Sequence, residues 1–374
     1  MKKAICLILS ALLVLSCMVT AASAEGTGTT YYVDSVSGND ANSGTSESAA
    51  WKTAANIVDR TFSAGDSVLF KRGGVYEMEL YAKGSGTAEA PITFSDYGEG
   101  ALPLITTNGY GVVFNLSSVS HWVLEDLEIT APKYEISKGG DGKMRIDRCA
   151  TAIFMRAEGG YVGRGYTFRN LKIHDVFNTS SDNYNSSTAA AVRIQTGGEA
   201  YHGYYNDILF DGIELYDCAY GIDINGVLDD NAEAPDGHTD GVNEFHKNFT
   251  VINSYFHDLY DDGVIIGCTD GYLVRNTVFL NVAWDTLYFT CPIWSHLVNH
   301  GLLENNEVGG AANYMDGMAI DFDDRTQNTT VQYLYSHDNC KMMWACQWTA
   351  HQYNNVVRYC LSVNDGKVAG GQCN

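Results

Sequence analysis

The stretch Ser254-Tyr255-Phe256-His257-Asp258, followed by Gly263-Val264-Ile265-Ile266, shows the unit from which this chain is built. It reads as two short apolar strands separated by a polar turn. The first strand of the unit recurs at residues 171–175, 213–217, 277–281, 306–310, 334–338 and 360–364. The second recurs at residues 192–194, 222–224, 286–289, 320–322, 342–345 and 368–370. Such self-similarity is typical of an architecture in which each unit stacks on the previous one.

The spacing of the second strands gives the length of one repeat. Their central residues are, in order, Arg193, Asp223, Ile265, Tyr288, Asp321, Trp344 and Ala369, and the steps between them range from 23 to 42 residues. A repeat near 23 residues with insertions is typical of one coil of a parallel β-helix. We therefore predict an all-β fold, a single right-handed parallel β-helix with three short strands per coil, because parallel crossovers prefer that hand.

Side chains of a strand alternate between its two faces, which assigns the core and the outer surface. The residues predicted to point inward are Val192, Ile194, Ile222, Ile224, Val264, Ile266, Leu287, Phe289, Ile320 and Phe322. The residues predicted to point outward, one coil after another, are Arg193, Asp223, Ile265, Tyr288, Asp321 and Trp344. Charged and aromatic side chains together on one outer face favour a binding groove, with a plain solvated face as the alternative.

The N-terminus has the features of an export signal. Lys2 and Lys3 precede an apolar run over residues 4–19, and Ala22-Ser23-Ala24 is a small-residue cleavage site. A lipoprotein signal ending before Cys17 is the alternative. We predict a signal peptide at residues 1–24, a secreted, extracellular protein, and one β-helix domain over residues 25–374. Within this domain we expect a cap with the first coils at 25–105 and coils with insertions at 106–374.

Composition narrows the class of partner. The chain has 374 residues, with 45 acidic against 23 basic side chains and a net charge of -22. Nucleic-acid binding needs basic surfaces, so we expect no nucleic-acid partner. We expect no membrane partner after signal cleavage, because no later stretch is long and apolar enough to span a bilayer. A monomer acting on neutral polysaccharide or oligosaccharide fits this charge, whereas a polyanionic substrate fits only with a bridging cation.

Cysteine usage leaves the redox state open. Eight cysteines follow the signal, at 149, 218, 268, 291, 340, 346, 360 and 373. Their even number in an exported chain permits disulfides. However, most lie in or beside predicted strands, where a free thiol packs as a small apolar group. We favour mostly free thiols, and the lack of a CxxC motif argues against zinc.

The beginning of the mature chain carries a resemblance to a known group of enzymes. It reads Tyr31-Tyr32-Val33-Asp34, then Gly38-Asn39-Asp40-Ala41-Asn42-Ser43-Gly44-Thr45, Trp51-Lys52-Thr53-Ala54, Gly65-Asp66-Ser67-Val68-Leu69-Phe70 and Ala90-Pro91-Ile92-Thr93-Phe94. This resembles secreted right-handed parallel β-helix carbohydrate-active enzymes, which include family 9 pectate lyases and several glycosidase families. The resemblance covers about residues 30–105 by motif and the rest by coil pattern. It implies the fold and leaves hydrolysis and β-elimination open.

A cap is also expected from the residues themselves. The first coil of a solenoid has an uncovered apolar end. Residues 53–60 have a helical composition and are expected to cover it. The first coils are expected to take strands at 68–70, 92–94, 112–114 and 123–129.

Carboxylates gather at the beginnings of the second strands. They are Asp223, Asp261, Asp262, Asp285, Asp316, Asp321, Asp323 and Asp324. Glycoside hydrolysis requires two carboxyl groups, one that donates a proton and one that activates water or attacks carbon. We predict a glycoside hydrolase of a plant-type saccharide in which Asp321 is the acid and Asp262 the base, with Asp285 sharing or orienting the water. The predicted sugar-binding residues are Arg193, Asp223, Tyr288, Trp344 and Trp348.

Three alternatives remain at this point. Aspartate before glycine is ordinary turn chemistry, and a turn role would explain Asp262, Asp285 and Asp316 without catalysis. The sequence Asp261-Asp262-Gly263 resembles a calcium site of family 9 pectate lyases, which implies a calcium-dependent lyase. However, the strand that follows lacks the further Asp of those enzymes, and the outward column has no lysine to act as base. A non-catalytic carbohydrate-binding or adhesive β-helix is the third reading. No cofactor is required by the hydrolase prediction. Calcium stays open, also because the predicted loop over residues 227–244 is rich in acids.

A second polar ladder is predicted to be structural. It is formed by Asp175, Asp217, Asp258, Asn281, Asp338 and Asn364, which recur at one turn of each coil. Stacked Asp and Asn side chains can satisfy the backbone of such turns. His174, His257 and His337 precede three of these residues, and we interpret them as turn residues rather than metal ligands.

Overall fold

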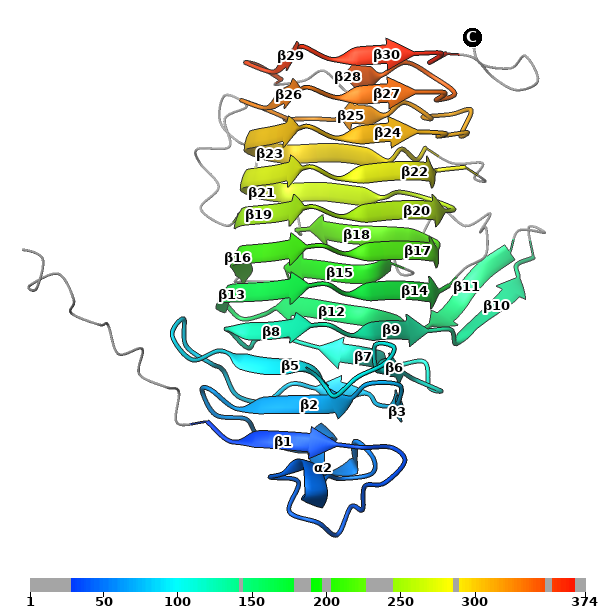
Figure 1. Cartoon of the computed structure of the whole chain (residues 1–374). Coiled ribbons are helices and arrows are strands. Elements are labelled where there is room, and N and C mark those ends of the chain that lie inside the picture. Colours follow the sequence, from blue (N-terminus) through cyan, green and yellow to red (C-terminus); the bar gives the residue numbers. More distant parts are fainter. Residues whose placement is uncertain are drawn as a thin grey trace, which may run out of the picture.

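The computed structural model describes residues 28–140, 144–177, 190–196, 203–226, 245–284, 289–346 and 352–366, and these residues form a right-handed parallel β-helix (Figure 1). The predicted fold is therefore confirmed. The predicted signal at 1–24 lies outside the described residues. Among those described, no helix is long and apolar enough to cross a membrane.

Three parallel ladders of strands run the length of the molecule. The first ladder contains β4 (Leu80–Tyr81), β7 (Val112–Asn115), β12 (Thr151–Ala157), β15 (Ala190–Thr196), β18 (Tyr220–Asn225), β25 (Ile320–Phe322) and β28 (Trp344–Cys346). The second contains β1 (Thr30–Val33), β2 (Ser67–Lys71), β5 (Ile92–Tyr97), β8 (Trp122–Glu125), β13 (Val162–Arg169), β16 (Tyr204–Asp211), β19 (His246–Ile252), β26 (Thr330–Gln332) and β29 (Val356–Arg358). Two long strands belong to both ladders, β21 (Val264–Arg275) and β23 (Ile293–Glu304).

The third ladder is a separate sheet. It contains β3 (Val75–Glu77), β6 (Leu104–Thr106), β9 (Glu128–Ala131), β14 (Lys172–Val176), β17 (Glu214–Cys218), β20 (Tyr255–Leu259), β22 (Val278–Val282), β24 (Glu307–Gly309), β27 (Tyr335–His337) and β30 (Leu361–Val363). The short helix α2 (Ala55–Val58) and the 3-10 turn η1 (Glu47–Ala49) lie at the N-terminal end of the solenoid, and Ile57 of α2 is buried in the core. A short helical element thus lies where the cap was expected.

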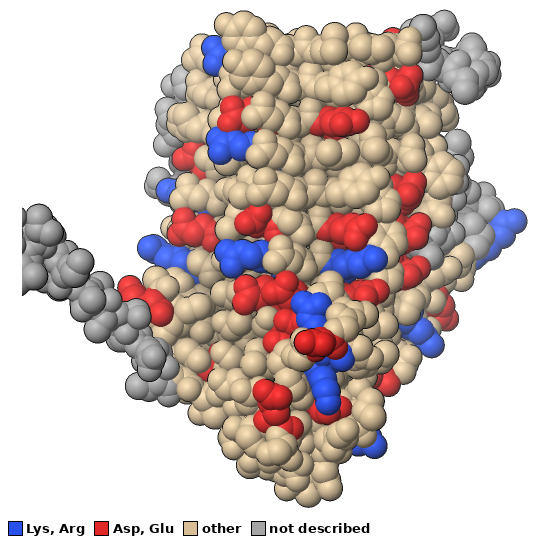
Figure 2. Space-filling view, viewed as in Figure 1, with Lys and Arg blue, Asp and Glu red and all other residues tan. Residues whose placement is uncertain are grey.

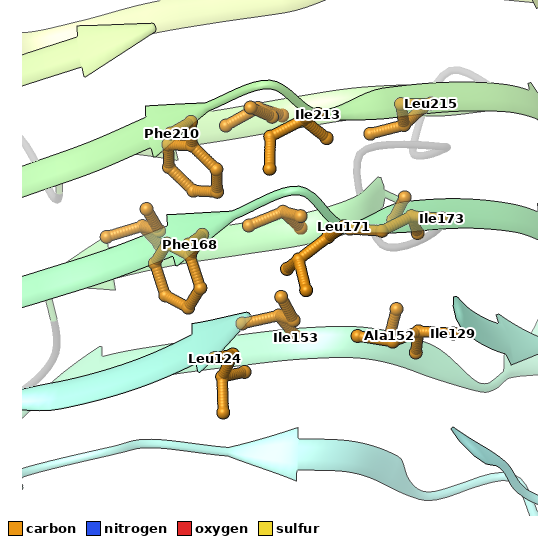
Figure 3. Packing of buried hydrophobic residues seen from close by; sticks show 14 of the residues in the cluster. Leu124, Ile129, Ala152, Ile153, Phe168, Leu171, Ile173, Phe210, Ile213 and Leu215 are labelled. Carbon is orange, nitrogen blue, oxygen red and sulfur yellow. The ribbon is translucent and has the colours of Figure 1, made fainter. Parts of the chain in front are cut away.

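Like side chains stack on one another in the core. Phe168 of β13 lies under Phe210 of β16 with ring centroids 4.6 Å apart, and Ile173 of β14 pairs with Leu215 of β17 (Figure 3). Phe210 continues the stack to Phe249 of β19 at 5.9 Å. Each coil buries its apolar side chains only against neighbouring coils, so every repeat needs the next one for its stability.

Removal of one core ring tests this stacking. Phe210 is fully buried between Phe168 and Phe249, so Phe210→Ala is expected to lower the free energy of unfolding by about 3–5 kcal/mol. Urea unfolding followed by circular dichroism measures this loss. The control is Tyr81→Ala in β4, where the ring is exposed and a change within about 0.5 kcal/mol is expected. Equal losses in the two variants would contradict the stacked core.

The Asp and Asn residues of the predicted structural ladder lie in turns with left-handed backbone. All six ladder residues have positive φ angles between 47° and 59°. The amide of Asn281 donates to Asp258 at 3.1 Å, and that of Asn364 donates to Asp338 at 3.3 Å. Asp and Asn tolerate this conformation better than other non-glycine residues, because their side chains bond locally to the turn.

The three histidines that precede this ladder lie beside its carboxylates. Nδ1 of His174 lies 2.8 Å from Asp175, that of His257 2.8 Å from Asp258, and that of His337 3.0 Å from Asp338. Their interpretation as turn residues agrees with these contacts.

Some local predictions are corrected by the structure. The single strand expected at 123–129 is divided at Asp126, whose φ of 55° forms the turn between β8 and β9. The polar segment after β9 forms an antiparallel hairpin of β10 (Tyr134–Lys138) and β11 (Met144–Cys149). The strand expected at 286–289 is wrong at its end, because Phe289 is exposed rather than inward. Residues 285–288 lie outside the described part, and the first-ladder strand of this coil is β23.

Charged side chains on the second and third ladders are paired across coils. Figure 2 shows acidic and basic side chains close together over the middle of this face. Lys172 lies 3.8 Å from Glu214, and Arg275 lies 2.6 Å from Glu304. Such exposed pairs contribute little stability, but they leave this face with balanced charge rather than a concentrated acidic site.

Most described cysteines form no disulfide, as favoured from the sequence. Those without a disulfide are Cys149, Cys218, Cys268, Cys291, Cys346 and Cys360. Cys340 is disulfide-bonded, and Cys373 lies outside the described residues.

Candidate active site

The outer face of the first ladder carries a continuous column of side chains. The strand register joins, coil by coil, Arg193, Asp223, Ile265, Trp294, Asp321 and Ala345. The predicted positions of Arg193, Asp223, Ile265 and Asp321 in this column are confirmed. Trp294 of β23 occupies the place predicted for Tyr288, which lies outside the described residues. An aromatic ring therefore does lie beside Asp321, although from a different residue.

The prediction for Trp344 is wrong by one residue. Trp344 pairs with the buried Ile320, and its ring packs edge-on against Phe322 at 5.8 Å, so it belongs to the inward register. Ala345 takes the outward position beside Asp321. The outward step from Asp321 to Ala345 is one residue longer than the basic repeat, and a slip of one residue moves each side chain to the opposite face.

Four carboxyl groups near this column form a cluster, which we call the carboxyl cluster and define as Asp262, Asp316, Asp321 and Asp323. Asp316 links the other three, because its charge is a cause of the raised pKa of each of them. Asp262 and Asp321 lie two coils apart, as predicted, and Asp316 lies close to both. The sequence pattern contained Asp316 and Asp323, but the prediction did not give either of them a role.

Asp316 is held in place by a tight turn before β25. The side chain of Asn313 accepts the backbone N–H of Met315 at 2.7 Å and that of Asp316 at 2.9 Å. The amide of Asn313 donates to Thr290 at 3.1 Å, which ties the turn to the preceding coil. Gly317 must lack a side chain, because a Cβ there would lie 2.1 Å from the carbonyl oxygen of Asn313. Turn chemistry and a functional position therefore coincide at Asp316.

Asp321 has the electrostatics of a proton donor. Burial is the main cause that raises the pKa of Asp321 to about 7, and the charges of Asp323 and Asp316 raise it further, against the opposing charge of Lys341. Its Oδ1 atom is buried and has no hydrogen-bond partner among the described residues. A carboxylic acid in this state keeps its proton near neutral pH and can give it to a substrate oxygen.

Asp323 is the next outward carboxyl along the same chain segment. It follows the inward Phe322 and is half-buried, so it is more accessible than Asp321. Burial, together with Asp316 and Asp324, raises its pKa, although a backbone hydrogen bond opposes the shift. The backbone N–H of Asp323 donates to the carbonyl of Ser295 at 2.8 Å, which fixes the segment against β23.

Asp262 lies deeper than a general base is expected to lie. Its Oδ1 accepts the backbone N–H of Cys291 at 2.9 Å, and its side chain is buried. Burial raises its pKa well above the usual range, with further contributions from the charges of Asp261, Asp223 and Asp316. A neutral carboxyl group is a poor base, so the burial of Asp262 argues against its predicted role as general base.

Arg193 and Asp223 form a pair at the N-terminal side of the cluster. Nε of Arg193 lies 3.8 Å from Asp223, and the amide oxygen of Gln195 lies 2.7 and 2.8 Å from the guanidinium when the amide is oriented to accept from it. Burial raises the pKa of Asp223 to about 6, although Arg193 lowers it. The basic side chain of the column is therefore already engaged by neighbouring groups.

Several predicted site residues cannot be placed. Asp285, Tyr288 and Trp348 lie outside the described residues, as does the acidic segment 227–244. Within the described ranges, no three His, Cys, Asp or Glu side chains are grouped so that they could hold a metal ion.

The sequence prediction did not place Trp294 and His296 of β23 on this face. Their rings stack 5.1 Å apart, and Trp294 pairs with Asp321 in the register. The signal for them was the alternation in Ile293-Trp294-Ser295-His296-Leu297, which reads as a strand with two aromatic side chains on one face.

Comparison with known proteins gives one relative by sequence and further relatives by structure. No family model matches the chain. It is 28% identical over 431 aligned residues to a lacto-N-biosidase of Bifidobacterium longum subsp. longum, covering 92% of this chain and 26% of that protein. The chain thus spans about a quarter of the length of this relative.

Two solved structures share the fold. A GH136 lacto-N-biosidase from Eubacterium ramulus superposes with a TM-score of 0.65 and 23% identity, covering 90% of this chain and 60% of that one. An alginate lyase from Paenibacillus sp. str. FPU-7 superposes with a TM-score of 0.52 and 15% identity, covering 83% and 95%. The chain therefore shares its β-helix with enzymes that act on saccharides by two different reactions, and its sequence is similar to part of a lacto-N-biosidase.

Proposed function

We propose that this chain is the catalytic β-helix of a glycoside hydrolase that cleaves an oligosaccharide. The observation that carries the proposal is the carboxyl cluster, in which Asp321 has a pKa of about 7 and lies beside Trp294 on one outer face. A glycosidase needs a carboxylic acid that is still protonated at working pH and a second carboxylate near it. The sequence similarity to a lacto-N-biosidase supports the same reaction class.

The residues take the following roles in this proposal. Asp321 donates its proton to the glycosidic oxygen, and Asp316 is the second carboxyl group, which acts as nucleophile or activates water. Asp262, proposed from the sequence as the base, is instead a buried carboxyl group that stays protonated and takes no part in proton transfer. Asp285 stays a prediction as an additional carboxyl group, and Tyr288 and Trp348 stay predictions as sugar-binding residues.

The substrate we propose is a neutral oligosaccharide that contains lacto-N-biose. The plant-type saccharide expected from the sequence is replaced, because the sequence relative is named for lacto-N-biose and not for a plant polymer. The pairing of Arg193 with Asp223 and Gln195 also fits a neutral sugar better than a uronate, which would need a cation of its own. Export through the predicted signal and a monomeric state remain parts of the proposal.

A lyase reaction receives less support. The likeness to an alginate lyase concerns the fold, and elimination needs a base beside a uronate carboxylate. The cluster instead offers acids with raised pKa values, which suit proton donation. Calcium binding by this chain is not part of the proposed reaction.

The proposal is tested with purified chain and an aryl lacto-N-bioside, by following release of the phenol and of free lacto-N-biose. We expect release of both, and no release from the matching aryl glucuronide. Turnover of the glucuronide alone would contradict the proposed substrate.

The pH profile of the reaction follows from Asp321. Because the acid must be protonated, kcat/KM is expected to fall as pH rises through about 7, the pKa of this group in the free protein. The measurement is kcat/KM on the aryl lacto-N-bioside from pH 5 to 9. A value that stays constant across this range would show that no group with this pKa acts as the acid.

A further inference from the structure

One coil beyond Asp223, side chains of the two neighbouring coils close over Gly267 on the outer face of the first ladder. Gly267 pairs with His296 in the strand register. A Cβ atom built on Gly267 would lie 2.5 Å from Nε2 of His296 and 2.7 Å from Oδ1 of Asn225. The imidazole and the amide thus lean over this glycine from the two neighbouring coils. No other residue type fits at this position without moving one of them.

Two ring nitrogens beside Gly267 have no hydrogen-bond partner among the described residues. Nε2 of His296 and Nε1 of Trp294 are both buried and make no hydrogen bond with any described residue. Their rings stack 5.1 Å apart with an angle of 27° between the planes. Buried polar atoms are almost always hydrogen-bonded in folded proteins, so two orphaned donors or acceptors side by side indicate a ligand.

The side chains around Gly267 are uncharged near neutral pH, which favours a neutral ligand. Burial lowers the pKa of His296 to about 4, so its imidazole is neutral and offers one N–H donor and one acceptor nitrogen. The indole of Trp294 donates only, and the amide oxygen of Asn225 already accepts the N–H of Gly226 at 2.9 Å, which fixes its orientation. A hydroxyl group both donates and accepts, so it satisfies His296 in either tautomer.

We propose that Asn225, Gly267, Trp294 and His296 form a sugar subsite that binds hydroxyl groups of a neutral pyranose, with the sugar ring against Trp294. This rests on the proposed function for the identity of the ligand, but its residues are separate from the carboxyl cluster. Trp294 pairs with Asp321 in the register, and neighbouring strands lie about 4.8 Å apart, so a sugar held here places its glycosidic bond next to the acid. The subsite therefore positions the substrate and selects against uronates.

Direct binding tests the subsite without turnover. The probe is free lacto-N-biose, titrated by calorimetry into the wild-type chain and into Gly267→Ala and His296→Phe. Gly267→Ala forces His296 or Asn225 out of place, and His296→Phe keeps a ring but removes both nitrogens. Each displaces or removes a buried hydrogen-bonding group, so we expect the dissociation constant to rise about 5- to 100-fold in each.

Two matched controls guard against general damage. Gly140→Ala adds a Cβ where no atom lies within 4 Å, and His300→Asn changes an exposed histidine of the same strand β23. Both controls are expected to bind as the wild type does, and both of them and His296→Phe should show wild-type thermal unfolding. Gly267→Ala is expected to unfold at a somewhat lower temperature, because its Cβ displaces a neighbour. If a test variant unfolds early, Trp294→Phe is measured instead, because it keeps an aromatic ring while it removes the indole N–H.

The outcomes separate this inference from the proposed function. In Asp321→Asn, retained binding with lost turnover supports both. If Asp321→Asn turns over fully while Gly267→Ala loses binding, the subsite stands and the catalytic assignment fails. The inference is overturned if folded Gly267→Ala and His296→Phe bind lacto-N-biose as tightly as the wild type. It is also overturned if the wild type binds glucuronic acid but not lacto-N-biose.

Discussion

Asp321→Asn is expected to lower kcat on an aryl lacto-N-bioside by about 10²–10⁴-fold, because the amide keeps the shape of the acid but cannot donate its proton. Asp321 points outward between the buried Ile320 and Phe322, so packing fixes its direction and the variant should keep the geometry of the site. KM should change little, since substrate is bound mainly by groups outside this carboxyl.

The stability of the same variant provides an internal check. The folded-state pKa of Asp321 is raised to about 7 from an ordinary value of 3.8, so the folded protein holds this proton more tightly than the unfolded chain. Stability from this group is therefore present below about pH 4 and is lost as pH rises through about 7. Asp321→Asn should unfold like the wild type at pH 4 and at a higher temperature than the wild type at pH 8.

Asp270→Asn is the matched control for this prediction. Asp270 lies on β21 away from the carboxyl cluster and pairs with His300 at 2.8 Å. Its replacement should leave kcat unchanged. If Asp321→Asn retains turnover while Asp323→Asn abolishes it, then the acid is the next outward carboxyl group and our assignment of Asp321 is wrong.

Asp316→Asn is expected to lower kcat by at least as much as Asp321→Asn does. It removes the proposed second carboxyl group, whose charge acts on the other three members of the cluster. Loss of its charge should also reduce the pKa of Asp321 and of Asp323, since Asp316 contributes to raising both. The alkaline limb of any residual activity should therefore move to lower pH. Residual kcat and its pH profile, measured on the aryl lacto-N-bioside, check both effects.

Folding must be controlled separately at this position. Asn313 accepts the backbone N–H of Asp316, and the substitution leaves this bond in place, so the turn should survive it. Asp270→Asn serves as the control here as well, because Asp270 is paired with His300 at 2.8 Å outside the cluster. An Asp316→Asn variant that is folded and keeps wild-type kcat would remove Asp316 from the reaction.

The fold could be predicted because each coil repeats the same pattern of apolar strands and polar turns. Apolar pairs such as Ile222 and Ile224 mark the core side of a strand, and residues such as Asp258 and Asn281 mark the left-handed turns. These local signals determine the structure of one coil, and neighbouring coils with the same signals stack in the same way. An insertion changes the spacing without changing the pattern.

The site was harder to predict, because it depends on the register between coils. The sequence pattern did not show where the strand of that coil begins. The prediction therefore placed Tyr288 in the column, whereas the strand begins at Ile293 and Trp294 takes that position. The slip of one residue at Trp344 arose in the same way. Asp316 was among the predicted carboxylates but received no role, because its nearness to Asp262, Asp321 and Asp323 follows from stacking rather than from sequence spacing.

The most direct test of the account is mass spectrometry of the products formed when the purified chain acts on an oligosaccharide with a terminal lacto-N-biose unit. We predict free lacto-N-biose and a shortened saccharide whose combined mass exceeds that of the substrate by one water, with both products lost in Asp321→Asn. An intact substrate would contradict the account, and so would equal product formation by wild type and Asp321→Asn.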